Sequence, residues 1–285
     1  KIGDRAKMLN MNKVLVVTGS HIRKIKNGPV DQTLASLENA GVEYVVFDGA
    51  EENPKIRDIK KGKQIYLDNN CDSIITVGGG SAHDCGKGIG IILTNGDDIT
   101  KLAGIETLDK PLPPLMAVNT TAGTGSELTR HAVITNEETH LKFVVVSWRN
   151  IPLVSFNDRM LMLEIPQSTT AATGLDAYVQ AVEPYVSVDH NDITDSQCEK
   201  AIKLIQQYLP EAVANGNNVE ARTKMVEGEM LAGMAFNNAN LGYVHAMAHQ
   251  LGGQYDAPHG VCCALMLPVV EEWNIIACPD RFAEL

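Results

Sequence analysis

Three histidines late in the chain have a spacing that suits a metal site. His245 and His249 are four residues apart in a stretch rich in alanine, methionine and leucine, which predicts a helix with both imidazoles on one face. We expect that helix to end at Gly252 and Gly253, and the Pro-His-Gly turn that follows to bring His259 back toward it. Imidazoles placed in this way can bind a divalent metal, although a helix of core histidines would have the same spacing.

An earlier aspartate is the best candidate for a carboxylate ligand. Residues 173–183 have apolar side chains at helical spacing and include Asp176, with Gln180 one turn later. Thr169 and Thr170 offer N-terminal caps, which would place Asp176 near the start of the helix. From these residues alone, a carboxylate that stabilises the helix dipole is the simpler explanation, and a metal ligand is the alternative.

The composition excludes several classes of partner. The chain has 285 residues, enough for two domains, and its 24 basic and 35 acidic residues give a net charge of −11. This charge argues against nucleic acid and anionic membranes, because phosphate contacts need clustered lysine and arginine. No apolar run approaches the roughly 18 residues of a membrane-spanning helix, and no secretory signal is visible. The six cysteines contain no CxxC pair, which indicates reduced thiols in a cytoplasmic protein.

Strand and helix patterns alternate through the first half of the chain. Short β-branched or apolar runs predict strands at residues 13–18, 42–47, 73–77, 114–118, 132–135, 142–147 and 153–156. Helical patterns fall at 29–40, 56–69 and from 82 onward, so an open α/β sheet is expected. Beyond about residue 161 the pattern is helical. The chain is therefore divided into an α/β domain, 1–160, and an all-α domain, 161–285, with the boundary near 159–166.

Two polar loops follow neighbouring predicted strands. Residues 78–81 (GGGS) precede a predicted helix, where backbone N–H groups can approach a phosphate or pyrophosphate. The loop is neither a Walker A nor a GxGxxG motif, and a purely structural turn is the alternative. The second loop carries the hydroxyls of Thr120, Thr121 and Thr124, which suit a nucleotide lying across the strand ends.

Taken together, these stretches resemble the iron-dependent alcohol dehydrogenase family. The stretches GGGSAHDCGKG, AVNTTAGTGSE, TGLDA and GYVHAMAHQLGG, with a later PHG, match that family's motifs in order and spacing. The resemblance covers essentially the whole chain. It implies a dinucleotide-binding α/β domain with a parallel sheet and an all-α metal-binding domain, with the site in the cleft between them. Family members extend further at both ends, so the chain is expected to be a truncated member.

The resemblance also implies a ligand set. The family's metal positions correspond here to Asp176, Gln180, His245 and His259, and the metal would be Fe2+, with Zn2+ as an alternative. Gln180 departs from the family's histidine, and a neutral amide oxygen is a weaker ligand for these ions than imidazole. His249 matches a residue beside the metal and is the candidate for passing a proton to solvent.

Further positions follow from the same resemblance. Gly79, Gly80, Ser81 and Asp84 match the pyrophosphate loop and helix start, Thr120, Thr121 and Lys142 the nicotinamide half, Asn53 the ribose, and His131 and Phe236 the substrate channel. Gly19 stands where NAD-preferring members carry an aspartate that bonds the adenosine ribose. Its loss removes repulsion of a 2′-phosphate, so the cofactor is expected to be NAD or NADP, with NADP tolerated or preferred.

The implied activity is a metal-dependent oxidoreductase that interconverts a short primary alcohol or diol, such as 1,3-propanediol, with its aldehyde. One alternative is a catalytically impaired pseudoenzyme or scaffold subunit, weakened at Gln180. Another is a zinc-dependent polyol dehydrogenase or carbon–oxygen lyase on the same fold. The resemblance further implies a homo-oligomer, a dimer or a decamer.

Overall fold

The computed structural model describes residues 1–163 and 165–285, so one residue of the predicted boundary region 159–166 lies outside it. The chain forms two compact units. The first comprises Lys1–Thr120 and Arg130–Asn157, and the second comprises Thr121–Thr129 and Asp158–Leu285. The loop 121–129 thus leaves the first unit and packs with the second. No helix among the described residues is long and apolar enough to cross a membrane.

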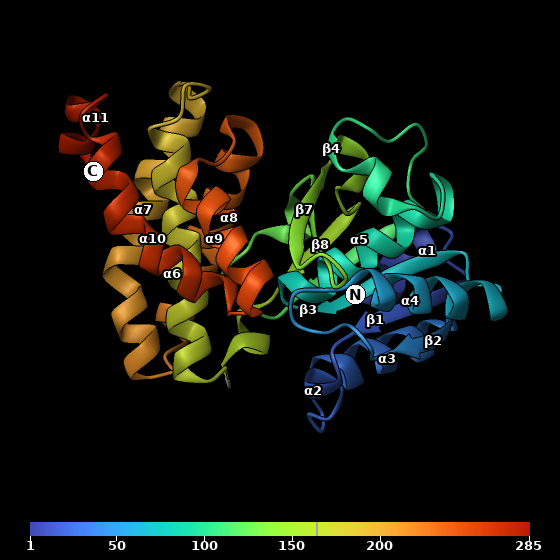
Figure 1. The fold of residues 1–285 in the computed structure, drawn as a ribbon. Helices are drawn as coiled ribbons and strands as arrows, with labels where there is room; N and C mark the ends of the chain where they lie inside the picture. Colours follow the sequence, from blue (N-terminus) through green and yellow to red (C-terminus); the bar gives the residue numbers. More distant parts are fainter. Residues whose placement is uncertain (164) are drawn as a thin grey trace. The chain divides into compact units, whose positions relative to one another are not determined.

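A five-stranded parallel sheet forms the centre of the first unit (Figure 1). Its strands are β1 (Lys13–Thr18), β2 (Glu43–Phe47), β3 (Ser73–Gly78), β5 (Leu115–Asn119) and β8 (Val154–Asn157), in the order β2-β1-β3-β5-β8. Every residue of β3 and β5 is buried, which explains why these strands consist mainly of apolar and β-branched residues. The predicted parallel sheet is confirmed.

Helices cover both faces of this sheet. They are α1 (Ile2–Met8), α2 (Ser20–Arg23), α3 (Pro29–Ala40), α4 (Ile56–Asp68) and α5 (Gly80–Thr94). Helix α1 packs on α3, and α4 packs beside α5 on the other face. Helix α3 has the predicted bounds, because Pro29 suits the first helical turn and Gly41 ends the helix in the left-handed conformation.

Two of the predicted strands belong to a different sheet. Strands β6 (His131–Asn136) and β7 (Leu141–Val146) form an antiparallel hairpin, and β4 (Gly104–Ile105) joins the edge of β7. The sequence predicted these strands but did not assign them to a second sheet. The connection between β6 and β7 is too short for the crossover that a parallel pair requires. Short 3-10 helices complete the chain at Ile99–Leu102, Ser126–Leu128, Trp148–Asn150 and Arg159–Met162.

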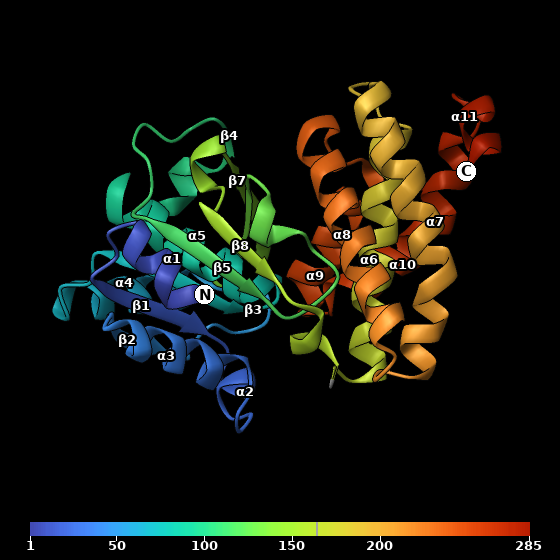
Figure 2. The same ribbon diagram turned by 180° about the vertical axis from the view of Figure 1, so that it is seen from behind.

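The second unit is helical. It contains α6 (Gln167–Tyr185), α7 (Asp192–Ala214), α8 (Val219–Ala239), α9 (Tyr243–Tyr255), α10 (His259–Asn274) and α11 (Pro279–Glu284). The three long helices α6, α7 and α8 lie side by side (Figures 1 and 2), and α10 packs on α6 and on α9. Their shared core is built of alanine, isoleucine and methionine side chains. Helices α6, α9 and α10 supply the candidate metal ligands.

The helix ends in this unit differ from the sequence prediction. Helix α6 begins at Gln167, so Thr169 and Thr170 lie inside it, and Asp176 sits more than two turns from its N-terminus. A helix-dipole role for Asp176 is therefore wrong, because that effect fades within the first turn. Helix α9 continues through both glycines and ends where Asp256 adopts left-handed angles (φ 51°, ψ 32°), which aspartate tolerates.

Candidate functional site

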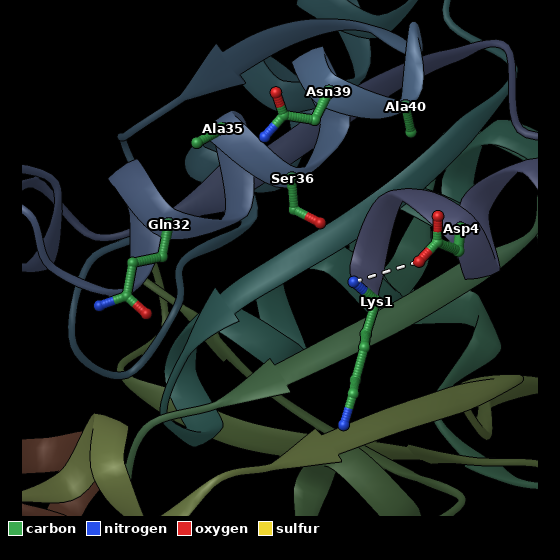
Figure 3. Close-up of a pocket in the computed structure, with 7 residues that line it drawn as sticks. All are labelled: Lys1, Asp4, Gln32, Ala35, Ser36, Asn39 and Ala40. Carbon is green, nitrogen blue, oxygen red and sulfur yellow. Dashed lines mark ion pairs between the residues drawn. The ribbon is translucent and has the colours of Figure 1, made fainter.

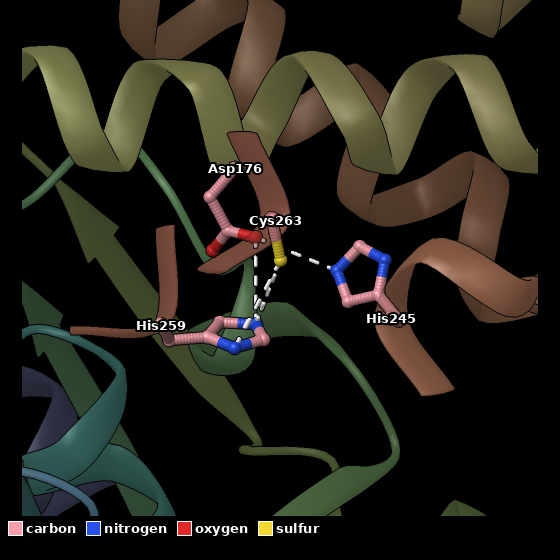
Figure 4. Close-up of side chains that lie close together, drawn as sticks. All are labelled: Asp176, His245, His259 and Cys263. Carbon is pink, nitrogen blue, oxygen red and sulfur yellow. Dashed lines mark hydrogen bonds and ion pairs between the residues drawn. The ribbon is translucent and has the colours of Figure 1, made fainter. Parts of the chain in front are cut away.

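An aspartate and two histidines from three helices converge in the second unit (Figure 4). The Oδ1 atom of Asp176 lies 3.4 Å from Nε2 of His245 and 3.5 Å from Nε2 of His259. Asp176 and His245 are only 2% and 3% exposed. The sequence predicted that His259 lies on a turn. It is instead the first residue of α10, following Pro258. Three of the four predicted metal positions therefore point at one another.

Several polar atoms here are buried without hydrogen bonds. Oδ1 of Asp176, Nε2 of His245 and Oε1 of Gln180 have no hydrogen-bond partner among the described residues. A buried polar group without a partner costs free energy, of the order of 1–3 kcal/mol for each group. Three such atoms on α6 and α9 indicate that the site is built to receive a further group. An ion that accepts lone pairs would satisfy Oδ1 of Asp176 and Nε2 of His245, which belong to the converging ligand atoms.

The electrostatics favour a positive charge at this point. Burial disfavours an ionised Asp176, but the positive charges of the neighbouring His259 and His245 rings outweigh burial and lower the pKa of the carboxyl group. Burial likewise disfavours a charged His245. The charge of Cys263 and the hydrogen bond to Glu183 nonetheless raise the pKa of this imidazole well above its usual value. A divalent cation would interact with the same carboxylate and thiol groups, Asp176 and Cys263.

A second carboxylate on α6 orients the His245 ring. Oε2 of Glu183 lies 2.5 Å from Nδ1 of His245, and Oε1 accepts the backbone N–H of Val244 at 2.8 Å. Glu183 thus holds the ring and also stabilises the start of α9, whose N-cap residue, Gly242, has no side chain. Fixing Nδ1 in this way directs Nε2 toward Asp176. Sequence reasoning missed Glu183, although its spacing of seven from Asp176 places both on one helical face.

A cysteine that was also missed belongs to the cluster. Sγ of Cys263 is fully buried and lies 3.7 Å from Nε2 of His259. The four ligand atoms of Asp176, His245, His259 and Cys263 all lie within 4.8 Å of one another. The spacing of four between His259 and Cys263 was the available signal, because it puts both side chains on one face of α10.

A glycine contact brings α10 against α6. A Cβ atom at Gly260 would lie 2.1 Å from the carbonyl oxygen of Ala172, so only glycine fits without moving the backbone. Gly260 is next to His259 and three residues before Cys263. The close approach of α10 to α6 at Gly260 therefore determines how far the side chains of His259 and Cys263 lie from Asp176.

His249 lies beside this cluster. Its ring centroid is 5.2 Å from that of His259 and 6.2 Å from that of His245. The side chain is half-buried, in contrast to the buried ring of His245. The structure thus brings the third predicted histidine close to the candidate ligands, at a position with access to solvent.

The glycine loop of the first unit joins β3 to α5. Gly78 has φ 155°, a conformation that residues with side chains rarely adopt, and a Cβ there would lie 2.7 Å from Cβ of Ala82. Helix α5 begins at Gly80, two residues earlier than predicted, with Gly79 as its N-cap. The N–H groups of Gly80 and Ser81 therefore belong to the first turn, where helices bind anions.

Four other predicted cofactor-binding residues of this unit have defined contacts or a defined place at the start of a helix. Nζ of Lys142 donates to Oδ1 of Asn53 at 2.6 Å, which joins two predicted residues 89 positions apart. The Asp84 carboxylate accepts the N–H of Val133 at 3.1 Å, so it anchors β6 to α5. Gly19 is the N-cap of α2 with ordinary extended angles (φ −87°, ψ 149°).

The remaining predicted residues divide between the units. Thr120, which is buried, and His131, whose carbonyl oxygen accepts from Nζ of Lys87 at 2.7 Å, belong to the first unit. Thr121, Thr124 and Phe236 belong to the second, where the buried Phe236 packs near Gly125.

A hollow between α1 and α3 contains none of the predicted site residues (Figure 3). It is lined by Lys1, Asp4, Gln32, Ala35, Ser36, Asn39 and Ala40.

Comparison with known proteins matches both halves of the chain. The sequence profile of the iron-containing alcohol dehydrogenases matches residues 1–159, and that of the C-terminal region of the Fe-containing alcohol dehydrogenase family matches 170–285. The 1,3-propanediol dehydrogenase of Citrobacter freundii is 57% identical over 284 residues, which are 100% of this chain and 73% of that protein. The NAD-dependent methanol dehydrogenase of Bacillus methanolicus is 38% identical over 285 residues, 100% of this chain and 74% of that protein.

A solved structure agrees with these matches. The alcohol dehydrogenase from Oenococcus oeni superposes with a TM-score of 0.96 at 77% identity, covering 99% of this chain and 74% of that one. Nothing in the comparisons supports the alternative of a catalytically impaired scaffold. The chain belongs to the iron-containing alcohol dehydrogenase family, and it is an oxidoreductase that acts on alcohols and aldehydes.

Proposed function

We propose that this enzyme interconverts a short primary alcohol or diol, such as 1,3-propanediol, with its aldehyde, using NAD or NADP. The observation that carries the proposal is the convergence of Asp176, His245 and His259 around polar atoms that lack hydrogen bonds. The substrate class is supported by a relative that is named a 1,3-propanediol dehydrogenase and is 57% identical.

The residues present fit a divalent metal. Asp176, His245 and His259 would hold it, and Gln180 offers a buried amide oxygen nearby on α6. When bound, Fe2+ or Zn2+ would polarise the substrate oxygen as a Lewis acid, while the nicotinamide would donate or accept the hydride. Glu183 holds the ring of His245 in the orientation this binding needs.

The other residues have roles that their positions support. The first turn of α5, at Gly80 and Ser81, would hold the pyrophosphate. Lys142 would lie near the nicotinamide half, and Asn53, to which it donates a hydrogen bond, near the ribose. His249, half-buried beside His259, would carry the proton between substrate and solvent. These roles extend to the remaining predicted residues: Gly19, Gly79, Asp84, Thr120, Thr121 and Thr124 at the cofactor, and His131 and Phe236 at the substrate.

Turnover assays test the proposal. The protein is loaded anaerobically with Fe2+ or Zn2+, and oxidation of NADH and NADPH is followed with 3-hydroxypropionaldehyde and with propionaldehyde. We expect turnover that a chelator abolishes and that the metal restores. A folded, metal-loaded protein that oxidises neither cofactor with either aldehyde would contradict the proposal.

Assembly and location are further parts of the proposal. We infer a homo-oligomer, since α10 presents an apolar stripe in which Leu265, Val269 and Trp273 are at least 60% exposed. We also infer a cytoplasmic location, which the free cysteines support. Light scattering of the purified protein would test the assembly, and a monomer at micromolar concentration would refute it.

A further inference from the structure

The fourth ligand position of the candidate metal site lies beside Asp176, His245 and His259. Asp176, His245 and His259 supply three donor atoms, and the family resemblance points to Gln180 for the fourth. Sγ of Cys263 lies among the three donors (Figure 4). We propose that the thiolate of Cys263, and not the amide of Gln180, is the fourth protein ligand and makes this a site that selects Zn2+ over Fe2+. The inference rests on the proposed metal site.

The distances fit a tetrahedral shell. With metal–nitrogen and metal–oxygen bonds of about 2.0–2.1 Å and metal–sulfur bonds of about 2.3 Å, neighbouring ligand atoms lie about 3.4–3.6 Å apart. The observed separations are 3.4 Å and 3.5 Å from Asp176 to the two imidazoles, and 3.7 Å from Sγ of Cys263 to Nε2 of His259. All the separations among the four atoms are within 4.8 Å, so sharing one ion would draw the more distant pairs together by about 1 Å.

The charges favour the thiolate over the amide. Asp176 and a thiolate at Cys263 together carry two negative charges, which neutralise a divalent cation in this buried place. With Gln180 as the fourth ligand, the ligand atoms would carry only one negative charge, and the second charge of the ion would be balanced only by Glu183, across the His245 ring. Forming the metal–sulfur bond breaks the S–H bond, and the thiol proton leaves to solvent.

The ligand type then determines the metal. Thiolate is a soft ligand that suits Zn2+, whereas carboxylate and imidazole alone are tolerated by harder ions such as Fe2+. Replacing an imidazole position by an amide and bringing in a thiolate therefore shifts the site toward zinc.

The chain offers a matched control for this cysteine. Cys262 is also buried, in the same turn of α10, but it is not a member of the group of converging ligand atoms. Replacing either cysteine by serine changes one sulfur to oxygen at the same depth. A change in a sulfur-to-metal signal that occurs in Cys263→Ser and not in Cys262→Ser therefore reports on metal ligation and not on the loss of a buried thiol.

Cobalt spectroscopy of the purified protein tests the proposal. Co2+ takes the place of Zn2+, and a bound thiolate gives an intense sulfur-to-cobalt charge-transfer absorption in the near ultraviolet. We expect this absorption in the unmodified protein, in Cys262→Ser and in Gln180→Ala, and its loss in Cys263→Ser. The Zn2+ dissociation constant, measured by competition with a chelator, should rise at least about 100-fold in Cys263→Ser and less than about threefold in Cys262→Ser.

Two results would overturn the proposal, and they separate it from the proposed function. In the first, the protein binds Co2+ stoichiometrically but shows no charge-transfer absorption, and the Co2+ affinity falls in Gln180→Ala but not in Cys263→Ser. This result would assign the fourth position to Gln180 and leave the proposed metal site intact. Failure of the folded protein to bind either Co2+ or Zn2+ would overturn the metal site itself.

Discussion

Oε2 of Glu183 lies 2.5 Å from Nδ1 of His245, on the side of the ring opposite the nitrogen that faces Asp176. The Glu183 carboxylate thus fixes the orientation of the ring, while the Asp176 carboxylate lies against Nε2, on its other side. A metal-binding histidine commonly has such a partner, which keeps the ring oriented and raises its basicity. Because both carboxylates belong to α6, the orientation of His245 on α9 depends on the packing of these two helices.

Glu183→Gln should weaken metal binding without unfolding the protein. The amide keeps the size of the side chain but loses the charge that orients the ring, so we expect metal affinity to fall about 10- to 100-fold. A chelator competition assay with Zn2+ measures this change. Glu227→Gln, at a surface position of α8, serves as the control and should leave the affinity unchanged. Equal affinity in the two variants would contradict the role given to Glu183.

Gly260→Ala should displace the start of α10. The added Cβ would lie 2.1 Å from the carbonyl oxygen of Ala172, so the helices must separate, at a cost of about 1–3 kcal/mol. Because His259 and Cys263 move with α10, metal affinity should fall together with thermal stability. Calorimetry with and without Zn2+ measures both effects. Val261→Ala, at an exposed neighbouring position, should change neither, and a fully stable Gly260→Ala would refute the packing argument.

Gly19→Asp should shift cofactor preference toward NAD. Gly19 has extended angles open to any residue and is the N-cap of α2, a position that aspartate favours. Its carboxylate would bond the ribose hydroxyls of NADH and repel the 2′-phosphate of NADPH. The ratio of kcat/KM for NADH to that for NADPH should rise at least about tenfold, which corresponds to one favourable charged contact. Gly19→Asn isolates the charge, and the same ratio in both variants would rule out the repulsion.

Acid should destabilise the first unit through His83. Burial, and then the charge of Lys87, lower the pKa of His83 to about 3, whereas an unfolded histidine titrates near 6.5. The folded form binds fewer protons, so the contribution of the neutral ring is complete above about pH 6.5. It is lost as the pH falls toward 3, by up to about 1.4 kcal/mol per pH unit.

His83→Gln should therefore lose less stability than the unmodified protein between pH 6.5 and 4.5. Urea unfolding can be followed by Trp148, which belongs to the first unit, in a Trp273→Phe background that silences the second unit. His21→Gln, at an exposed site on α2, is the control. Parallel stability curves for all three proteins would show that His83 is not the group responsible.

His249→Ala should flatten the pH dependence of turnover while leaving metal affinity within about threefold. The ring lies 5.2 Å from that of His259, at half-buried depth, so it can exchange protons with solvent without being needed to hold the ion. Rate against pH, together with the Zn2+ dissociation constant, separates the two roles. A large loss of metal affinity would make His249 a ligand instead.

Local patterns in the sequence were enough to predict most helices and strands and some of the residues of the candidate site. The apolar runs of β3 and β5, the proline and glycine that bound α3, and the glycines before α5 depend on backbone geometry and near neighbours, which the order of residues specifies directly. The histidine spacing and Asp176 were likewise visible, and the structure brings Asp176, His245 and His259 together.

Only the tertiary structure decided what completes that cluster. Helix ends differ from the prediction at α6 and α9: α6 begins before the threonines that are local start signals, and α9 continues past the glycines that are local stop signals. The contributions of Glu183 and Cys263 depend on how α9 and α10 approach α6, and the contact of Gly260 with Ala172 sets part of that approach. Such contacts join residues that are far apart in the chain, so no local pattern records them, and the identity of the fourth ligand follows from packing rather than from a motif.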